Sequence, residues 1–313
     1  MDSAISPTSS AEHARLTSRT AALSVGVAAL LIALKAWAWL ASSSVAMLAS
    51  LADSTLDLLA SLLTYFAVRY AAAPPDREHR FGHGKAEAFA GLMQGGLVAI
   101  SAVLIALEAI PRLFVVAPVS NGFASLAVMV VSIMLTVGLL GVQSRAIART
   151  GSVATRADRL HYVGDLASNL AVMLGVGAGY YLGWTWADAV AALLVAGWLC
   201  WGALHVGREA ADHLLDRELP EEQRRRIRAL AETDPRVTRV HDLRTRTSGP
   251  YTHIQFHVEL PPTMTLEDAH HLVVAAEERI RAEFPTADII IHPDPRGRAE
   301  PHGHEDFERA HHH

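Results

Sequence analysis

Six long apolar runs occupy the first two thirds of this sequence. They cover roughly residues 20–41, 45–68, 88–110, 122–144, 160–182 and 186–206. A helix needs about 20 mostly apolar residues to cross a bilayer, and each run reaches that length. Over the whole chain, 51% of the residues are hydrophobic and only 19% are charged. We therefore predict an α-helical membrane protein with six transmembrane helices.

Basic residues lie in alternate connections between these runs. The connections after the second and fourth runs contain Arg69, Arg77, Arg80 and Lys85, and Arg145, Arg149, Arg156 and Arg159, respectively. The other three connections contain Arg112 alone. Because Lys and Arg are retained on the cytoplasmic side, we predict that both chain termini are cytoplasmic.

After Arg208 the sequence changes to that of a water-soluble α+β unit. Residues 209–313 carry 14 Lys+Arg and 21 Asp+Glu, a net charge of −7, whereas residues 1–208 carry 13 and 11, a net charge of +2. Hydrophobic periodicity and turn residues predict the order αββαβ. The predicted elements are Glu221–Ala231, Val237–Thr247, Tyr251–Leu260, Leu266–Glu283 and Ala287–His292.

These changes in composition divide the chain into four segments. We predict a disordered tail at 1–15, a transmembrane domain at 16–208, a cytoplasmic domain at 209–295 and a disordered, His-containing tail at 296–313. The chain has one cysteine, which excludes an intramolecular disulfide and a Cys-based zinc cluster. The acidic C-terminal part disfavours a nucleic-acid partner.

Two apolar runs contain paired ionisable residues. Asp53 and Asp57 are four residues apart in the second run, and His161 and Asp165 have the same spacing in the fifth. This spacing places both members of a pair on one helix face. A charged group at the bilayer centre costs about 2.5–3.5 kcal/mol, so its charge has to be compensated. Three carboxylates and one imidazole from two facing helices supply the four ligands of a tetrahedral Zn²⁺ site.

Other interpretations of these residues stay open. Asp53 and Asp57 are also suited to line a proton path as neutral acids, or to pair with Lys35 in the first run. A lone His161 is also typical of a polar residue near a membrane interface. Asp57 lies near mid-membrane and His161 closer to the cytoplasm, a difference in depth that leads us to expect an early end of the fifth helix, near Ala178.

Six motifs, taken together and in this order, resemble the cation diffusion facilitator family. They are Leu51-Ala52-Asp53-Ser54 with Asp57, Phe81-Gly82-His83-Gly84-Lys85-Ala86-Glu87, His161-Tyr162 with Asp165, Leu214-Leu215-Asp216-Arg217, His241-Asp242-Leu243-Arg244-Thr245-Arg246 and Ile290-Ile291-His292-Pro293-Asp294. The resemblance implies a homodimeric, proton-coupled exporter of divalent metal in a bacterial inner membrane. It also implies a ferredoxin-like, metallochaperone-type cytoplasmic domain that mediates dimerisation.

The resemblance further implies three metal sites and an ion pair. The transport site is Asp53, Asp57, His161 and Asp165; the loop site is Asp76, His79 and His83; the binuclear site between two cytoplasmic domains is His241, His257, His270, His292 and Asp294; the interdomain ion pair is Lys85 and Asp216. Three Asp with one His is associated with Zn²⁺, Cd²⁺ and Fe²⁺, whereas four carboxylates suit Mn²⁺. His253 and His271 have no counterpart, and we expect both to be surface residues.

We therefore expect a secondary transporter that exchanges Zn²⁺ for protons across a lipid bilayer, and neither an enzyme nor a protein with an organic cofactor. Metal and protons compete for the same lone pairs, which favours such an exchange. A membrane-anchored metal sensor without transport is the alternative, although it has no use for four buried ligands on two helices. An intramembrane metallohydrolase is disfavoured because the sequence has no His-Glu-x-x-His motif.

Overall fold

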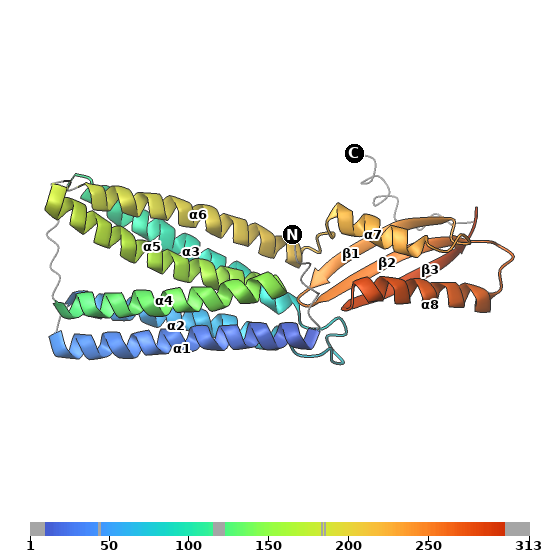
Figure 1. The fold of residues 1–313 in the computed structure, drawn as a ribbon, viewed down its shortest axis with the longest axis horizontal. Coiled ribbons are helices and arrows are strands. Elements are labelled where there is room, and N and C mark those ends of the chain that lie inside the picture. The colour runs from blue at the N-terminus through green and yellow to red at the C-terminus, as the bar shows by residue number, and fades with distance from the viewer. Residues whose placement is uncertain (1–9, 43–44, 115–122, 183, 185, 298–313) are drawn as a thin grey trace. The chain divides into compact units, whose positions relative to one another are not determined.

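The computed structural model describes residues 10–42, 45–114, 123–182, 184 and 186–297. Six long helices come first: α1 (Ser10–Ser42), α2 (Val45–Ala71), α3 (Lys85–Arg112), α4 (Phe123–Thr150), α5 (Val153–Leu182) and α6 (Ala187–Leu214). They are followed by α7 (Glu221–Ala231), β1 (Arg239–Ser248), β2 (Tyr251–Leu260), α8 (Leu266–Glu283) and β3 (Ala287–Pro295) (Figure 1). The predicted order of elements is confirmed.

The long helices extend beyond the apolar runs that predict them. α1 begins at Ser10, inside the segment expected to be disordered, and α6 continues to Leu214. Residues 1–9 and 298–313, which hold the rest of the two predicted tails, lie outside the described residues. The expected early end of the fifth helix near Ala178 is wrong, because α5 continues to Leu182. Instead α5 starts at Val153, before the apolar run, so that about two helical turns of α5 precede His161.

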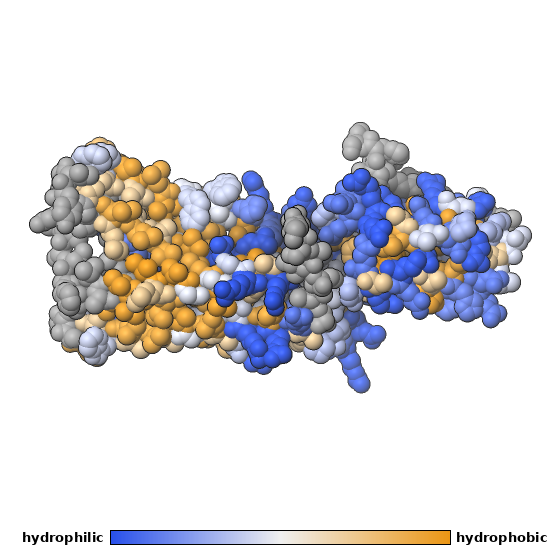
Figure 2. Space-filling model, viewed as in Figure 1, coloured by the Kyte–Doolittle hydropathy of each residue, from blue (hydrophilic) through white to orange (hydrophobic). Residues whose placement is uncertain are grey.

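Five of the described helices are long and apolar enough to cross a membrane: α1, α2, α3, α4 and α6. Only 28–33% of the residues in their apolar windows are buried, so most of these side chains need a non-aqueous environment. Figure 2 shows hydrophobic side chains over the visible face of the bundle and a mainly hydrophilic surface on the later elements. With 30 residues, α5 is long enough to be the sixth span, although its first half carries Arg156, Asp158, Arg159 and Asp165.

The long helices bury small residues where they meet. α3 packs against α2, α5 and α6, and α5 also packs against α4. Val68, Ala90 and Ala154 form a buried cluster of residues from α2, α3 and α5, which we call the apolar layer. Gly91 allows α3 to approach α5 closely, because a Cβ there would lie 2.8 Å from Val153 Cγ1. Small residues of this kind allow close packing of helices inside a membrane.

The chain separates into two compact units. The first runs to Leu215 and includes Ser248–Pro250, and the second contains Asp216–Thr247 and the chain from Tyr251 onward. In the second unit the strand order is β1-β2-β3, and β2 and β3 are parallel. Strand β3 extends three residues beyond the predicted end at His292, so that Asp294 pairs with Glu259 in the sheet.

The second unit has a two-layer core. Ile227 of α7 and Ile280 of α8 are both fully buried against Ile254, Phe256 and their neighbours on the sheet. Apolar residues alternate with polar ones in the sequence of β2, and the four apolar residues Ile254, Phe256, Val258 and Leu260 are all buried. On the opposite face of the sheet, Ile290 is exposed. The helices therefore cover one face of the sheet and leave the other face for polar residues.

We predict that Phe256→Ala lowers the free energy of unfolding of the second unit by about 3–5 kcal/mol, because it leaves a cavity under both helices. Guanidinium unfolding of residues 216–297, expressed alone and followed by circular dichroism, measures the change. His271→Ala, on the exposed side of α8, is the control and should change the free energy by about 0.5 kcal/mol or less. Equal effects of the two substitutions would contradict this core.

Candidate functional site

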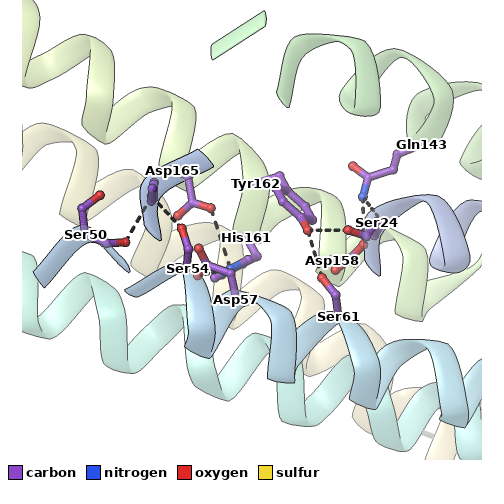
Figure 3. A network of polar contacts seen from close by, with 11 residues as sticks. Ser24, Ser50, Ser54, Asp57, Ser61, Gln143, Asp158, His161, Tyr162 and Asp165 are labelled. Atoms are coloured by element: carbon purple, nitrogen blue, oxygen red, sulfur yellow. Dashed lines mark hydrogen bonds and ion pairs between the residues drawn. The ribbon is translucent and has the colours of Figure 1, made fainter. Parts of the chain in front are cut away.

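Helices α2 and α5 bring three ionisable side chains together inside the bundle. His161 Nε2 lies 3.0 Å from Asp57 Oδ1 and 3.8 Å from Asp165 Oδ2 (Figure 3). The His161 side chain is 12% exposed and the Asp57 side chain 20%. One ring nitrogen thus faces two carboxylates from two helices. We call Asp57, His161 and Asp165 the triad.

The fourth residue of the predicted transport site is placed differently. Asp53 is exposed and lies one turn from Asp57 on α2. It is not in the group of possible metal ligands that Asp57, His161 and Asp165 form among the described residues. Lys35 of α1 donates from Nζ to Ser54 Oγ at 2.6 Å and to the carbonyl oxygen of Ser50 at 3.2 Å. The ammonium of Lys35 is therefore held at the turns of α2 that flank Asp53.

The predicted loop residues also lie together. Asp76 Oδ1 is 3.3 Å from His79 Nδ1, and Asp76 Oδ2 is 3.3 Å from His83 Nε2. The backbone N–H groups of His79 and Glu78 donate to Asp76 Oδ1, at 2.6 and 2.9 Å. These bonds, that of His79 first, lower the pKa of Asp76 below its usual value. His83 is buried, and its ring stacks at a tilt on Tyr70 with centroids 4.5 Å apart.

A third group lies on the sheet of the second unit. Asp294 Oδ2 is 2.9 Å from His257 Nδ1 and 3.3 Å from His241 Nε2, and Asp294 Oδ1 is 3.3 Å from His292 Nε2. The register explains this meeting, because His257 of β2 is opposite His292 of β3. Asp294 is buried, whereas the His292 side chain is 60% exposed. One carboxylate therefore joins three imidazoles from three strands.

The separations in these groups, 2.9–3.8 Å, are close to those between ligands of a single tetrahedral ion. Ligands at 2.0–2.2 Å from Zn²⁺ are about 3.3–3.6 Å from one another. In each of the three groups, three ligand atoms lie within 4.8 Å of one another. All donors are imidazole nitrogen or carboxylate oxygen, which suits Zn²⁺ and similar ions. The arrangement is thus chemically suited to divalent metal.

Some predicted residues lie apart from these groups. His270 is exposed on α8, with its ring centroid 6.1 Å from that of His271. Lys85 Nζ donates to the carbonyl oxygen of Leu214, and Asp216 Oδ2 accepts from Arg246 Nη1 at 3.3 Å. The ion pair between Lys85 and Asp216 stays a prediction.

The expectation that His253 is a surface residue is wrong. His253 is only 6% exposed, and its Nδ1 lies 3.2 Å from Asp288 Oδ2. The two residues are opposite each other in the register of β2 and β3, which brings their side chains to the same face of the sheet. His271, by contrast, is exposed on α8 as expected.

Sequence reasoning missed a buried carboxylate, that of Asp158. Its Oδ2 accepts hydrogen bonds from Ser24 Oγ at 2.7 Å and Gln143 Nε2 at 2.8 Å. Tyr162 donates to the carbonyl oxygen of Ser24 at 3.1 Å, and its hydroxyl lies 3.0 Å from Ser61 Oγ (Figure 3). Asp158 falls just before the predicted start of the fifth run at residue 160, although it lies one turn from His161.

The chain matches two protein families in succession. Residues 21–215 match the cation efflux transmembrane domain, and residues 219–296 match the cytoplasmic domain of cation efflux proteins. The chain belongs to the cation efflux family. It is a multi-pass membrane protein of metal cation efflux and not an enzyme, and the resemblance stated above is confirmed.

Full-length relatives within the cation efflux family support this assignment. The chain is 45% identical over 272 residues to the cation-efflux pump FieF of Shewanella oneidensis, covering 87% of this chain and 92% of the relative. It is 40% identical over 283 residues to FieF of Escherichia coli K12, covering 90% and 94%. A solved structure of the putative zinc transporter CzrB in its zinc form is 34% identical, with a TM-score of 0.26, and covers 27% of this chain and 98% of that one.

For the sheet cluster we predict that Asp294→Asn weakens Zn²⁺ binding to the second unit by about 10–100-fold, since the carboxylate joins three imidazoles. Isothermal titration calorimetry with Zn²⁺ measures the change. Asp288→Asn, on the same strand but 59% exposed and beside His253, is the matched control and should leave the affinity unchanged. If both substitutions weaken binding equally, Asp294 is not a ligand.

Proposed function

We propose that this protein is a proton-coupled antiporter that exports Zn²⁺, and with it Cd²⁺ or Fe²⁺, from the cytoplasm by alternating access. The observation that carries the proposal is the triad, in which His161 Nε2 faces Asp57 and Asp165 at 3.0 and 3.8 Å. A soluble or membrane-anchored metal sensor has no need of ligands at this position. The FieF relatives, which are named cation-efflux pumps, support the transport of cations.

The geometry of His161 explains why metal and proton exclude each other. A proton on Nε2 is donated toward Asp57 and neutralises part of the charge of the two carboxylates. A metal ion uses the lone pair of the same nitrogen, so it binds only after that proton has left. Release of Zn²⁺ on the outer side then requires that a proton return to Nε2. An inward proton gradient therefore drives outward metal movement.

Asp53 completes the transport site in this proposal. It stands one turn from Asp57 on the same helix, so a movement of α2 against α5 is enough to bring its carboxylate to the triad or to remove it. A triad that becomes a quartet binds metal more tightly in one state than in the other. Alternating access needs such a difference.

The remaining sites are proposed to act outside the transport step. We assign zinc to His241, His257, His292 and Asp294, with His270 joining this binuclear site in a homodimer. Bound metal offsets the net charge of −7 that residues 209–313 carry and so favours association of two cytoplasmic domains. Asp76, His79 and His83 form a further zinc site in the loop.

The proposed topology follows the distribution of basic residues. The chain lies in a bacterial inner membrane with both termini in the cytoplasm, and the boundary between transmembrane and cytoplasmic domains falls near residue 208. Lys85 and Asp216 hold the two domains together as an ion pair. Lipid surrounds the apolar helices.

Zinc flux into proteoliposomes tests the antiporter directly. We predict that an imposed pH gradient stimulates flux through the wild type and that Asp57→Asn abolishes the stimulated flux, because one face of the site loses its charged ligand. Glu108→Gln is the matched control, since Glu108 pairs with Arg112 at the exposed end of α3. Flux that ignores the pH gradient contradicts proton coupling. Absence of flux from the wild type, with zinc still bound by the second unit, supports the sensor instead.

Removal of His241 and His292 together tests the cytoplasmic site. We predict that the double Ala variant dimerises more weakly in the presence of zinc, measured by analytical ultracentrifugation of residues 216–297. Zinc affinity of the triad, measured on the full chain that carries the same two substitutions, should be unchanged. The paired exposed residues His270 and His271 offer a further comparison, because only His270→Ala is expected to weaken the dimer. Unchanged dimerisation in the double variant would contradict the proposed role of metal.

A further inference from the structure

Helices α2 and α5 carry the triad, yet they contact each other over a short stretch only. α2 packs mainly on α1, and α5 packs mainly on α6. The 3.0 Å separation of His161 Nε2 from Asp57 Oδ1 therefore depends on what else fixes α2 against α5. A set of hydrogen-bonded polar side chains lies beside the triad, and the metal sites do not use it (Figure 3). We call it the buried network; it consists of Ser24, Ser61, Gln143, Asp158 and Tyr162.

One hydrogen bond of the buried network joins α2 directly to α5. The hydroxyl oxygens of Ser61 and Tyr162 are 3.0 Å apart, and both residues are almost completely buried. Tyr162 donates its single hydroxyl proton to the carbonyl oxygen of Ser24 at 3.1 Å, because a carbonyl oxygen only accepts. Ser61 is therefore the donor in its bond to Tyr162. The contact between the two helices thus has a defined direction as well as a defined length.

Ser24 of α1 holds two residues of α5 that are one helical turn apart. Its carbonyl oxygen accepts from Tyr162, and its hydroxyl donates to Asp158 Oδ2 at 2.7 Å. Residues four positions apart lie on the same face of a helix. Contacts at both ends of this turn therefore fix the rotation of α5 about its own axis and its position along α1.

Gln143 joins α4 to the same group. Its Nε2 donates to Asp158 Oδ2 at 2.8 Å and to Ser24 Oγ at 3.2 Å. Gln143, Ser24 and Asp158 are at most 1% exposed. Because a buried polar group is costly to leave without its hydrogen bond, these contacts oppose a displacement of α1, α4 and α5 relative to one another. Tyr162 is thus held in place from two neighbouring helices.

The bond between Ser61 and Tyr162 lies next to the triad on both helices. Ser61 is one turn from Asp57 on the same face of α2. On α5, Tyr162 directly follows His161, and the two rings make an edge-to-face contact with centroids 5.7 Å apart. A change in the separation of α2 and α5 at this bond therefore changes the separation of Asp57 from His161.

The same bond is farther from Asp53. At a rise of about 1.5 Å per residue, Asp57 is about 6 Å from Ser61 along α2, and Asp53 is about 12 Å from it. A tilt of α2 about the bond therefore moves Asp53 about twice as far as Asp57. Such a tilt is able to bring the carboxylate of Asp53 toward the triad while Asp57 stays close to His161.

We propose that Ser61 and Tyr162 are positioning residues for the metal site of the triad, and that the rest of the buried network holds Tyr162 in place for this role. Their hydrogen bond keeps Asp57 and His161 at the separation that one metal ion requires. It is also the pivot about which Asp53 reaches the ion. The proposal rests on the transport site proposed above, and it gives Ser61 and Tyr162 no contact with metal.

The test uses Co²⁺, which replaces Zn²⁺ in tetrahedral sites and absorbs visible light there. The full chain is studied in detergent, with Asp76→Ala and Asp294→Ala present throughout to disable the loop and sheet clusters. We expect Tyr162→Phe and Ser61→Ala each to weaken Co²⁺ binding about tenfold and to reduce the absorption per bound ion. Both remove the same bond, so the double variant should bind no more weakly than Tyr162→Phe alone.

Thr64→Val is the matched control on α2. Thr64 lies three residues beyond Ser61 and is also buried, and within the part of the chain that the structure describes its hydroxyl has no hydrogen-bond partner in the protein. This substitution should leave the Co²⁺ affinity and the absorption unchanged. Partial unfolding of a variant is recognised separately, because it lowers the amount of Co²⁺ bound and not the affinity of the folded fraction.

Unchanged Co²⁺ affinity in Tyr162→Phe overturns the proposal, and so do losses from the two substitutions that simply add. An equal loss in Thr64→Val overturns it as well. If the parent protein with both other clusters disabled binds no Co²⁺, the transport site itself is wrong and the positioning role fails with it. Zinc flux that ignores a pH gradient contradicts proton coupling alone, since the affinities are measured without a gradient.

Discussion

The cost of placing charge inside a bilayer is the constraint on which the first unit depends. A carboxylate away from water needs a counter-ion, a proton or hydrogen bonds. The bundle supplies two of these in separate places. Asp57 and Asp165 face one imidazole nitrogen, which is able to exchange a proton for a metal ion. Asp158 instead accepts hydrogen bonds from neutral groups of α1 and α4. Carboxylates a few residues apart on α5 thus have different surroundings.

Much of this arrangement is predictable from residue spacing, and the failures have physical causes. The four-residue spacing of His161 and Asp165 identifies a helix face, but it gives no rotation of α2 against α5, and Asp53 therefore lies outside the triad. The apolar pattern of the sequence does not reveal Asp158, because an apolar run marks where a helix enters the lipid and not where the helix begins. In the second unit the alternation in β2 predicts the core, whereas the pairing of buried His253 with Asp288 depends on the register of β2 and β3, which no local pattern contains.

The two units bring similar sets of candidate ligands together by different means. In the bundle, the periodicity of single helices places these residues, and the packing of α2 on α5 sets their separation. In the second unit, candidate ligands far apart in sequence meet because strands align them, and a single buried carboxylate, Asp294, is their common contact. Small helix residues and strand register are thus the structural determinants of the two sites. Neither needs a dedicated metal-binding loop.

The pairing of His257 with His292 has a consequence for folding. Strands β2 and β3 are parallel and are joined through the whole of α8, so their alignment is not set by a tight turn. A slip of one residue would turn His292 and Asp294 toward the helix-covered face and separate them from His257. A cation bound by these side chains would stabilise only the native alignment of the two strands. The cluster would then favour the correct pairing of β2 and β3 during folding, before the protein transports any metal.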